Sequence, residues 1–226
     1  LIHISICYIK SLFKNVRIIM YTGIVLGTER IEAIEHHDGF HTIFVSNEKG
    51  FMNDAFIGAS IAVDGTCLTV TGMSEDQRVV SFDVGQVSLD LTTLGSLKVH
   101  DLVNIERSFK MGMENGGHNL YGHIEGTAKI VNIIHVGQTV QFDIQIPSHC
   151  MKYFFLKGFI GLHGCSLTIN RVDLEQEQIS VNLIPETLRL TKFGQMQIGD
   201  ALNFEIDQTT RTLVDTLENI YARKMA

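Results

Sequence analysis

The chain repeats itself at a constant spacing. Residues 65–70 (GTCLTV) match residues 164–169 (GCSLTI), and 164 minus 65 gives a spacing of 99. Further identical pairs share this spacing: Gly27 and Gly126, Met52 and Met151, Phe56 and Phe155, Gly95 and Gly194, Asp101 and Asp200, and Asn104 and Asn203. Such an offset predicts two tandem copies of one domain of about 90 residues, a size that supports one small core.

Charge and cysteine usage narrow the class of function. The net charge of −7 argues against a nucleic-acid or anionic-membrane partner, because both need a basic face. The four cysteines form no CxxC pair, and only His36 and His37 are adjacent histidines, without the spacing of a zinc site. We therefore predict no metal centre, and reduced thiols in a cytoplasmic protein.

Residues 1–19 differ in character from the rest of the chain. They form an apolar run in which Lys10, Lys14 and Arg17 come late, and Met20 follows. A secretory signal carries its charge before the apolar core, and a membrane span needs about 20 apolar residues, so neither fits. We expect a non-native or disordered leader outside the repeat, with Met20 as the functional start. An amphipathic anchor is the alternative.

Short β-forming runs fill each copy. In the first copy we expect strands at 20–25, 42–45, 60–63, 67–71, 79–84 and 102–106. Asp64-Gly65, and His163-Gly164 in the second copy, are typical of a tight hairpin turn with positive φ. Six short strands per copy favour an all-β fold of two tandem six-stranded closed barrels.

Two other segments lie between and after the copies. Residues 111–117 (MGMENGG) are typical of an interdomain linker. After Asp207 five apolar residues follow the helical period: Leu213, Val214, Leu217, Ile220 and Tyr221. We thus expect a leader at 1–19, barrels at 20–115 and 116–208, and a helix at 209–226. The helix packs against copies of itself or, alternatively, caps its own barrel.

Several motifs stand in a fixed order around the repeat. They are residues 20–25 (MYTGIV), 65–69 (GTCLT), 116–118 (GGH), 122–124 (GHI), 157–161 (KGFIG) and 184–188 (IPETL). Together they resemble the riboflavin synthase alpha chain family, from Met20 to about Tyr221.

The resemblance implies a homotrimer of double barrels held by the C-terminal helices. Each barrel binds one 6,7-dimethyl-8-ribityllumazine, and a four-carbon unit passes between two lumazines to give riboflavin and a ribitylamino-pyrimidinedione, without metal or organic cofactor. The active site forms between the N-terminal barrel of one subunit and the C-terminal barrel of its neighbour. Holding two identical substrates face to face replaces a three-body encounter by positioned chemistry. Lumazine synthase is a further candidate partner.

The resemblance also implies the substrate-binding positions. In the first copy they are Gly23, Ile24, Val25, Cys67, Leu68, Thr69, Asp83, Val84 and Ser88. In the second copy they are Gly122, His123, Ile124, Lys157, Ser166, Leu167, Thr168, Leu183, Ile184, Pro185, Glu186 and Thr187. Glu186 is expected to bind the ribityl hydroxyls.

Four of the matching residues are candidates for the chemistry. Cys67 and Ser166 are equivalent positions, and a thiolate is far more nucleophilic than a hydroxyl. His123 fits general acid/base work on a methyl proton or on water, and Asp207 aligns with a family carboxylate near the site. Three of them have an ordinary structural alternative: a small buried residue for Cys67, a satisfied strand histidine for His123, and a helix cap for Asp207. His118, after two glycines, is expected to be structural.

The first copy departs from the family pattern. Gln86-Val87-Ser88 stands where the family has Lys-Glu-Thr, so the ribityl-binding carboxylate is missing there. In the second copy His163 replaces the usual Asp. An alternative function is therefore a non-catalytic antenna protein that binds lumazine or flavin, since such relatives lose the ligand motif of one barrel. The persistence of Cys67 and His123 favours the enzyme.

Overall fold

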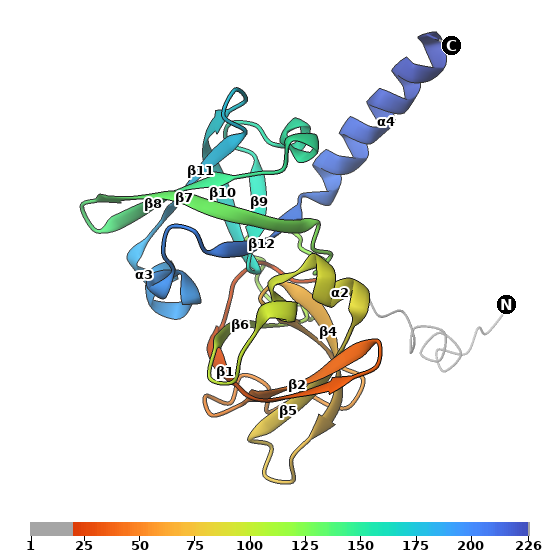
Figure 1. The fold of residues 1–226 in the computed structure, drawn as a ribbon, viewed down its shortest axis with the longest axis vertical. Coiled ribbons are helices and arrows are strands. Elements are labelled where there is room, and N and C mark those ends of the chain that lie inside the picture. The colour runs from red at the N-terminus through yellow and green to blue at the C-terminus, as the bar shows by residue number, and fades with distance from the viewer. Residues whose placement is uncertain (1–19, 226) are drawn as a thin grey trace, which may run out of the picture.

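Two closed barrels and one projecting helix make up the chain (Figure 1). The computed structural model describes residues 20–225, and the prediction for residues 1–19 lies outside them. The first barrel has the strand order β1-β2-β5-β4-β3-β6, with all neighbours antiparallel. Its strands are β1 (Gly27–His37), β2 (Phe40–Ser46), β3 (Ser60–Val63), β4 (Thr66–Met73), β5 (Val79–Gly85) and β6 (Leu102–Arg107).

The second barrel repeats this plan. Its strands, in the order β10-β11-β8-β7-β12-β9, close in the same way. They are β7 (Gly126–Val136), β8 (Thr139–Gln145), β9 (Phe159–Leu162), β10 (Cys165–Asp173), β11 (Gln178–Leu183) and β12 (Ala201–Ile206). The predicted all-β tandem-barrel fold is confirmed.

The repeat extends to the irregularities of the strands. The β1–β2 ladder shifts register between Ile31 and Ala33, and the β7–β8 ladder shifts between Ile130 and Asn132, at the same spacing. The β3–β4 turn has φ of 46° at Asp64 and 79° at Gly65. Because both angles are positive, the turn is the type I′ hairpin that the sequence predicts.

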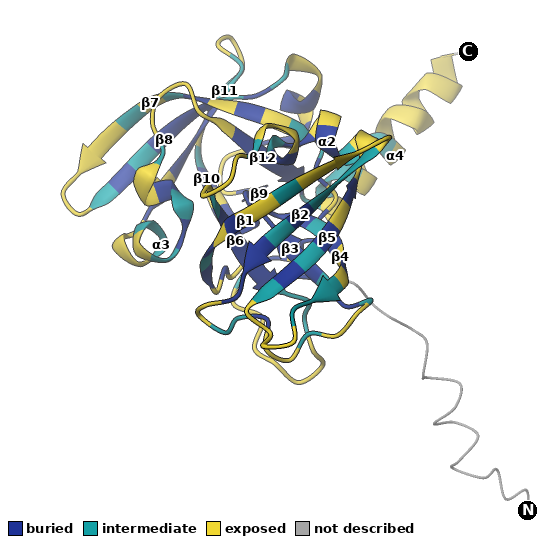
Figure 2. Ribbon diagram, turned by 60° about the horizontal axis from the view of Figure 1, so that its bottom comes forward, coloured by how far each residue is buried: buried dark blue, intermediate teal, exposed yellow. Residues whose placement is uncertain are grey.

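Alternation along the strands creates the two cores. Inward-facing aliphatic and aromatic side chains fill each barrel, and outward-facing positions are polar or exposed (Figure 2). Phe82 in the first barrel and Phe142 and Phe204 in the second are almost fully buried. These packed interiors leave the rims and the contact between barrels as the places for polar chemistry.

Short helices cover the ends of the strands. Each barrel carries one α-helical turn followed by a 3₁₀ turn, and the second barrel adds a further 3₁₀ segment after β8. They are α2 (Gln86–Leu91), η2 (Thr93–Ser96), η3 (Ser148–Tyr153), α3 (Pro185–Leu190) and η4 (Lys192–Gln195). Thr92 and Thr191 cap η2 and η4 in the same way, with hydroxyls that accept from the backbone two residues on.

The C-terminal helix α4 (Gln208–Met225) contacts the second barrel along its first half and then projects from it (Figure 1). The Asp207 carboxylate accepts from the backbone N–H of Thr210 at 2.8 Å, which stabilises the start of the helix. Tyr153 donates to Asp215 at 2.6 Å, and Lys152 pairs with Glu218. No helix within residues 20–225 is long and apolar enough to cross a membrane.

The expectation of a strand at 20–25 is wrong, and the equivalent segment around residues 122–124 forms no strand either. Only Tyr21 forms a bridge, to Leu120, and the backbone then runs irregularly to β1. Gly23 has φ of 74° and Gly122 has φ of 72°, in the left-handed region that interrupts a strand. These segments instead pack on the opposite barrel: Val25 joins the core of the second barrel.

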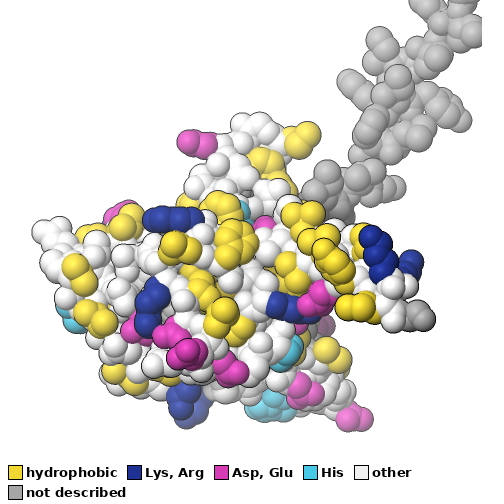
Figure 3. All heavy atoms as spheres, turned by 90° about the horizontal axis from the view of Figure 1, so that it is seen from above, with side chains coloured by type: hydrophobic (Ala, Val, Ile, Leu, Met, Phe, Trp, Pro, Cys, Tyr) yellow, Lys and Arg dark blue, Asp and Glu magenta, His cyan; other side chains and the backbone are white. Residues whose placement is uncertain are grey.

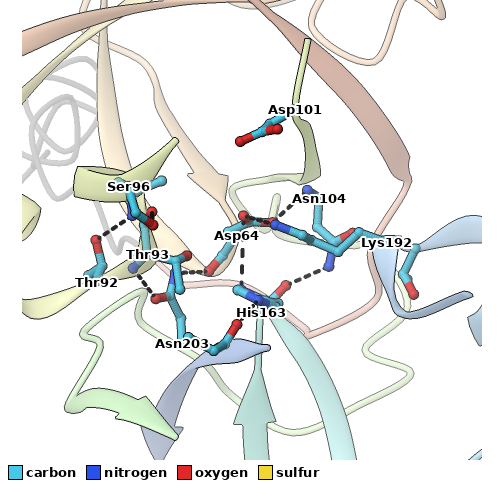
Figure 4. Close-up of polar contacts among 12 residues, drawn as sticks. Asp64, Thr92, Thr93, Ser96, Asp101, Asn104, His163, Lys192 and Asn203 are labelled. Atoms are coloured by element: carbon cyan, nitrogen blue, oxygen red, sulfur yellow. Dashed lines mark hydrogen bonds and ion pairs between the residues drawn. The ribbon is translucent and has the colours of Figure 1, made fainter. Parts of the chain in front are cut away.

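A buried polar network joins the barrels (Figure 4). Asn104 donates to the carbonyl of His163 at 2.9 Å, and Asn203 donates to the carbonyl of Asp64 at 2.9 Å, so the repeat spacing relates the two bonds. Lys192 breaks the symmetry, because its ammonium lies 2.8 Å from the Asp64 carboxylate, whereas Thr93 occupies the equivalent place. This network fixes the orientation of the two barrels.

Candidate functional site

Cys67 lies on β4, where the second half of the chain crosses the first barrel. Its backbone N–H donates to the carbonyl of Gly122 at 3.1 Å, and the Tyr21 hydroxyl donates to its Sγ at 3.2 Å. Burial raises the pKa of the Cys67 thiol. The thiol is therefore protonated at neutral pH, and the thiolate considered from the sequence is disfavoured here.

Ser166 lies at the equivalent place on β10, where the first half of the chain crosses the second barrel. Its backbone N–H donates to the carbonyl of Gly23 at 2.9 Å. Its Oγ accepts from the backbone N–H of His118 at 3.0 Å and lies 2.6 Å from the His118 Nδ1. Since the Oγ already accepts that N–H, its own proton is free to be donated to Nδ1.

The His118 imidazole is held in its neutral form. Burial lowers its pKa to about 4, although the nearby Asp207 charge acts in the opposite direction. The ring stacks on Phe159 with centroids 5.0 Å apart. A neutral imidazole beside a hydroxyl is the pairing in which a histidine acts as a base.

The two segments that cross to the opposite barrel, residues 20–25 and 122–124, need glycine where they touch the strands. We call them the crossing segments. A Cβ on Gly122 would lie 2.4 Å from the Cβ of Cys67, and a Cβ on Gly23 would lie 2.4 Å from the Cβ of Ser166. Both glycines also have positive φ, so two independent constraints exclude a side chain. The segments thus press backbone carbonyls directly against the two candidate residues.

Two buried carboxylates hold these segments in place. Glu106 of β6 accepts from the backbone N–H groups of Thr22 and Gly23 at 2.7 and 3.1 Å. Glu205 of β12 does the same for Tyr121 and Gly122 at 2.7 and 3.0 Å. Burial raises the pKa of each carboxyl to about 7, against the lowering effect of these hydrogen bonds.

The other predicted positions separate by strand face. Cys67 and Ser166 are half-buried and the threonines two residues on are exposed, so all four side chains leave the cores. The predicted residues Leu68, Val84, Leu167 and Leu183 point into the cores and can offer only backbone to a ligand. Cys165 is buried in the core of the second barrel, as its place on the strand predicts.

The equivalent helices α2 and α3 end their barrels differently. In α3 the exposed Glu186 forms two hydrogen bonds with Arg189, at 2.9 and 2.6 Å. In α2 the equivalent Val87 is 78% exposed, and Gln86 donates to Asp90 at 2.7 Å. The charge difference that the sequence indicates therefore extends to a second position, since Asp90 is equivalent to Arg189.

The remaining predicted residues lie around these two places. Ile24 and Ile184 are exposed, Ile124 is buried, and Lys157 has a positive φ of 68° in the turn before β9. Asp83 accepts from Thr42 at 2.7 Å on the outside of β5. The first-copy Ser88 and second-copy Thr187 offer equivalent carbonyls, which accept from Thr92 and Thr191.

His123 and Asp207 do not contact Cys67 or Ser166 directly through any hydrogen bond of the described residues. His123 is exposed and follows Gly122, with its ring 6.2 Å from that of Tyr121. Asp207 caps α4 and acts on the second site only through its charge near His118. Both thus lie at the rim of the sites.

Tyr21 and His118 are contacts that the sequence did not reveal. The repeat pairs Tyr21 with Leu120, and it pairs His118 with residue 19, before the first copy. Neither residue therefore has a matching partner in the other copy. The only sequence signal is their proximity to glycines, since Tyr21 lies two residues before Gly23 and His118 follows Gly117.

A hollow of about 350 Å³ opens beside the first crossing segment. Its lining includes Thr22, Ile24 and Glu106, and it does not reach Cys67 or Ser166. It has the size of a small ligand pocket. Ile24 is the one predicted substrate contact among its lining residues.

The two barrels match a known domain family separately. The lumazine binding domain family matches residues 22–108 and again residues 121–207. The chain is 41% identical over 207 residues to riboflavin synthase of Escherichia coli (strain K12), covering 91% of this chain and 95% of that protein. The chain belongs to the riboflavin synthase family of lumazine-binding proteins.

Further family members and solved structures resemble the chain over most of its length. Riboflavin synthase of Buchnera aphidicola subsp. Schizaphis graminum (strain Sg) is 38% identical over 208 residues, covering 92% of this chain and 98% of that protein. The crystal structure of LumP complexed with riboflavin matches with a TM-score of 0.75 and 28% identity, covering 82% of this chain and 98% of that one. Its complex with 6,7-dimethyl-8-(1'-D-ribityl) lumazine matches with a TM-score of 0.73 and 27% identity, with the same coverage.

Proposed function

We propose that this chain is a riboflavin synthase. It converts two molecules of 6,7-dimethyl-8-ribityllumazine to riboflavin and a ribitylamino-pyrimidinedione. The observation that carries the proposal is that each half of the chain contacts the barrel of the other half. The carbonyl of Gly122 accepts from Cys67, and the carbonyl of its repeat equivalent Gly23 accepts from Ser166. Two related but unequal sites suit a reaction in which two identical molecules play different parts.

The second site supplies the base. His118 is neutral at physiological pH and takes the Ser166 proton, so Ser166 can act on the bound lumazine or on water. Glu186 and Thr187 on α3 bind the ribityl hydroxyls at the open edge of this site. Lys157, Thr168 and the backbone of Leu183, Ile184 and Pro185 line it.

The first site supplies a protonated thiol. The Tyr21 hydroxyl fixes the Cys67 Sγ, and burial keeps the proton on sulfur, so Cys67 positions or protonates a lumazine and does not start as a free thiolate. Thr69, Asp83 and Ser88 lie on the same copy, and His123 stands at the rim as the candidate acid or base towards the substrate methyl group.

A trimer held by α4 completes the active site. Leu213, Leu217 and Ile220 are 60%, 54% and 45% exposed along one face of the helix. Hydrophobic side chains also gather on the face of the molecule where α4 projects (Figure 3). Association through this stripe brings the first barrel of one subunit to the second barrel of the next. A lumazine synthase shell is a candidate partner for that trimer, testable by co-sedimentation.

The direct test is incubation of the purified protein with 6,7-dimethyl-8-ribityllumazine while riboflavin fluorescence is followed. Riboflavin and the pyrimidinedione should appear in equal amounts. Binding without turnover would instead support the second candidate, a lumazine-binding antenna protein. The observation in favour of that candidate is the exposed Val87, which stands in the first barrel where the second barrel has Glu186.

A further inference from the structure

Three metal-ligating side chains meet at the base of α4. The donor atoms of Glu125, His149 and Cys150 all lie within 4.8 Å of one another. Glu125 precedes β7 and is half-buried, whereas η3 presents an exposed His149 and a buried Cys150. The sequence hides this group, because 24 positions separate Glu125 from the adjacent pair.

The group belongs to the second copy alone. The equivalent positions of the first copy hold Leu26, Gly50 and Phe51, none of which is a metal ligand. The Phe51 ring packs there against Gly27, where an added Cβ would lie 2.5 Å from it. The barrel fold therefore does not require donors at these places, and three of them coincide in one copy.

We propose that Glu125, His149 and Cys150 bind one divalent transition-metal ion of the zinc type. Thiolate, imidazole and carboxylate together select zinc over magnesium or calcium, which prefer oxygen ligands alone. Water completes the fourth position of a tetrahedral ion. The Cys150 S–H bond breaks as the sulfur–metal bond forms, and the proton passes to solvent.

The observed spacing needs only a small closure. Tetrahedral zinc with bonds of about 2.0–2.3 Å holds its donors roughly 3.3–3.8 Å apart. His149 is exposed, so its imidazole can rotate inward without disturbing a packed core. Cys150 and Glu125 provide the fixed side of the site, since one belongs to the core and the other is tied through its backbone N–H to Phe204.

One of the three donors, the Glu125 carboxylate, already pairs with an arginine side chain. The Arg211 guanidinium of α4 pairs with Glu125, and its Nε is buried without a hydrogen-bond partner among the described residues. The same guanidinium lies 5.6 Å from the Tyr153 ring centroid. The metal ion competes with Arg211 for the Glu125 carboxylate, so metal binding releases the first turn of α4 from this ion pair.

The test is a titration of chelator-treated full-length protein with Co²⁺ alone, followed by absorbance. Tetrahedral Co²⁺ bound to a thiolate gives visible d–d bands and a near-ultraviolet charge-transfer band. We expect one ion per chain, loss of the charge-transfer band in Cys150→Ser, and affinity at least about tenfold weaker in His149→Asn, since an outer partner alone contributes about that much. Because His149 is exposed, His149→Asn should leave folding intact.

Matched controls separate this site from other cysteines and histidines. Cys165→Ala and His135→Asn, in the same barrel, should keep the band and the affinity. Arg211→Met should tighten Co²⁺ binding about two- to fivefold, the usual strength of a partly exposed ion pair, and Arg223→Met should not. A band that survives in Cys150→Ser, an unchanged affinity in His149→Asn, or no response to Arg211→Met would overturn the proposal.

Discussion

Cys67 and Ser166 occupy the same place on equivalent strands, but their side chains meet different partners. A tyrosine hydroxyl donates to the thiol, whereas a neutral imidazole lies ready to accept the proton of the serine. The difference arises because Tyr21 and His118 come from segments that the repeat does not match. One copied framework thus gives two equivalent strand positions different chemical environments.

The His118→Asn variant should turn over slowly while binding substrate normally. Asparagine can keep the hydrogen bond to Ser166 but cannot accept its proton, so kcat should fall about 10²–10⁴-fold with KM nearly unchanged. The base is active when deprotonated and its pKa is about 4, so kcat/KM of the wild type should decline only as the pH falls towards 4. An acid limb centred near pH 6.5, or an unchanged kcat in the variant, would contradict this role.

The Cys67→Ser variant should also separate turnover from binding. A serine keeps the polar contact with Tyr21 but loses the polarisable sulfur, so we expect a large fall in kcat and a small change in the Kd for riboflavin. Stopped-flow turnover and fluorescence quenching measure the two quantities. If kcat stays at the wild-type value, Cys67 is only a small packed residue of the strand.

The short helices α2 and α3 are the elements in which the two copies differ most. Glu186 and Arg189 form an exposed ion pair on α3, and Val87 and Asp90 stand in their places on α2. At the position of Glu186, a carboxylate is therefore present in the second barrel only. The difference predicts unequal affinities in one chain.

Calorimetric titration of the full chain with riboflavin should resolve a tight and a weak site. A hydrogen bond to a charged group contributes about 1.5–3 kcal/mol, so the sites should differ about tenfold or more. Glu186→Val should weaken the tight site, and Val87→Glu combined with Asp90→Arg should tighten the weak one. The full chain is needed because each barrel is crossed by a segment of the other half. Equal sites in the wild type would refute the asymmetry.

The helix α4 makes its own prediction. Leu213→Glu combined with Ile220→Glu places charges on the exposed apolar stripe, so the protein should become monomeric by light scattering and lose most activity. Ala222→Glu, at an exposed position on the opposite face of the same helix, is the control and should stay associated. A double variant that keeps both its mass and its activity would show that α4 does not hold the assembly.

The sequence predicted the tandem barrels, because a repeat spacing and period-two strands are local and additive signals. Five of the six strands expected in the first copy are present, and the Asp64-Gly65 turn has the expected type. The crossing segments escaped prediction because MYTGIV has strand-forming residues, and only the contact with the other barrel shows why Gly23 needs positive φ. Partners such as His118 depend on tertiary contacts without a sequence pattern.

The two barrels act as one unit because a charged network is buried between them. Asp64 and His163 are fully buried at equivalent turns, and Lys192 balances the carboxylate (Figure 4). The His163 Nδ1 lies 3.9 Å from Asp64, and its Nε2 lies 3.3 Å from the carbonyl of Ala201. Burial lowers the pKa of His163 to about 4, and the Lys192 charge acts in the same direction while Asp64 opposes it.

The burial of His163 makes the free energy of unfolding depend on pH. Between pH 6.5 and 4 the unfolded chain binds a proton at residue 163 and the folded chain does not, so the free energy of unfolding falls as the pH drops through this window. One such group contributes about 1.4 kcal/mol per pH unit. Urea unfolding of His163→Asn should therefore show a pH slope smaller by about one proton than the wild type. The variant His135→Asn, at an exposed position, is the control.

Three other groups with shifted pKa values also make stability depend on pH. The shift of His118 acts with the same sign as that of His163, and the shifts of Glu106 and Glu205 act with the opposite sign. All three groups are present in the wild type and in His163→Asn, so their contributions cancel in the comparison. Equal slopes in His163→Asn and the wild type would show that His163 takes up its proton in the folded chain, beside Asp64.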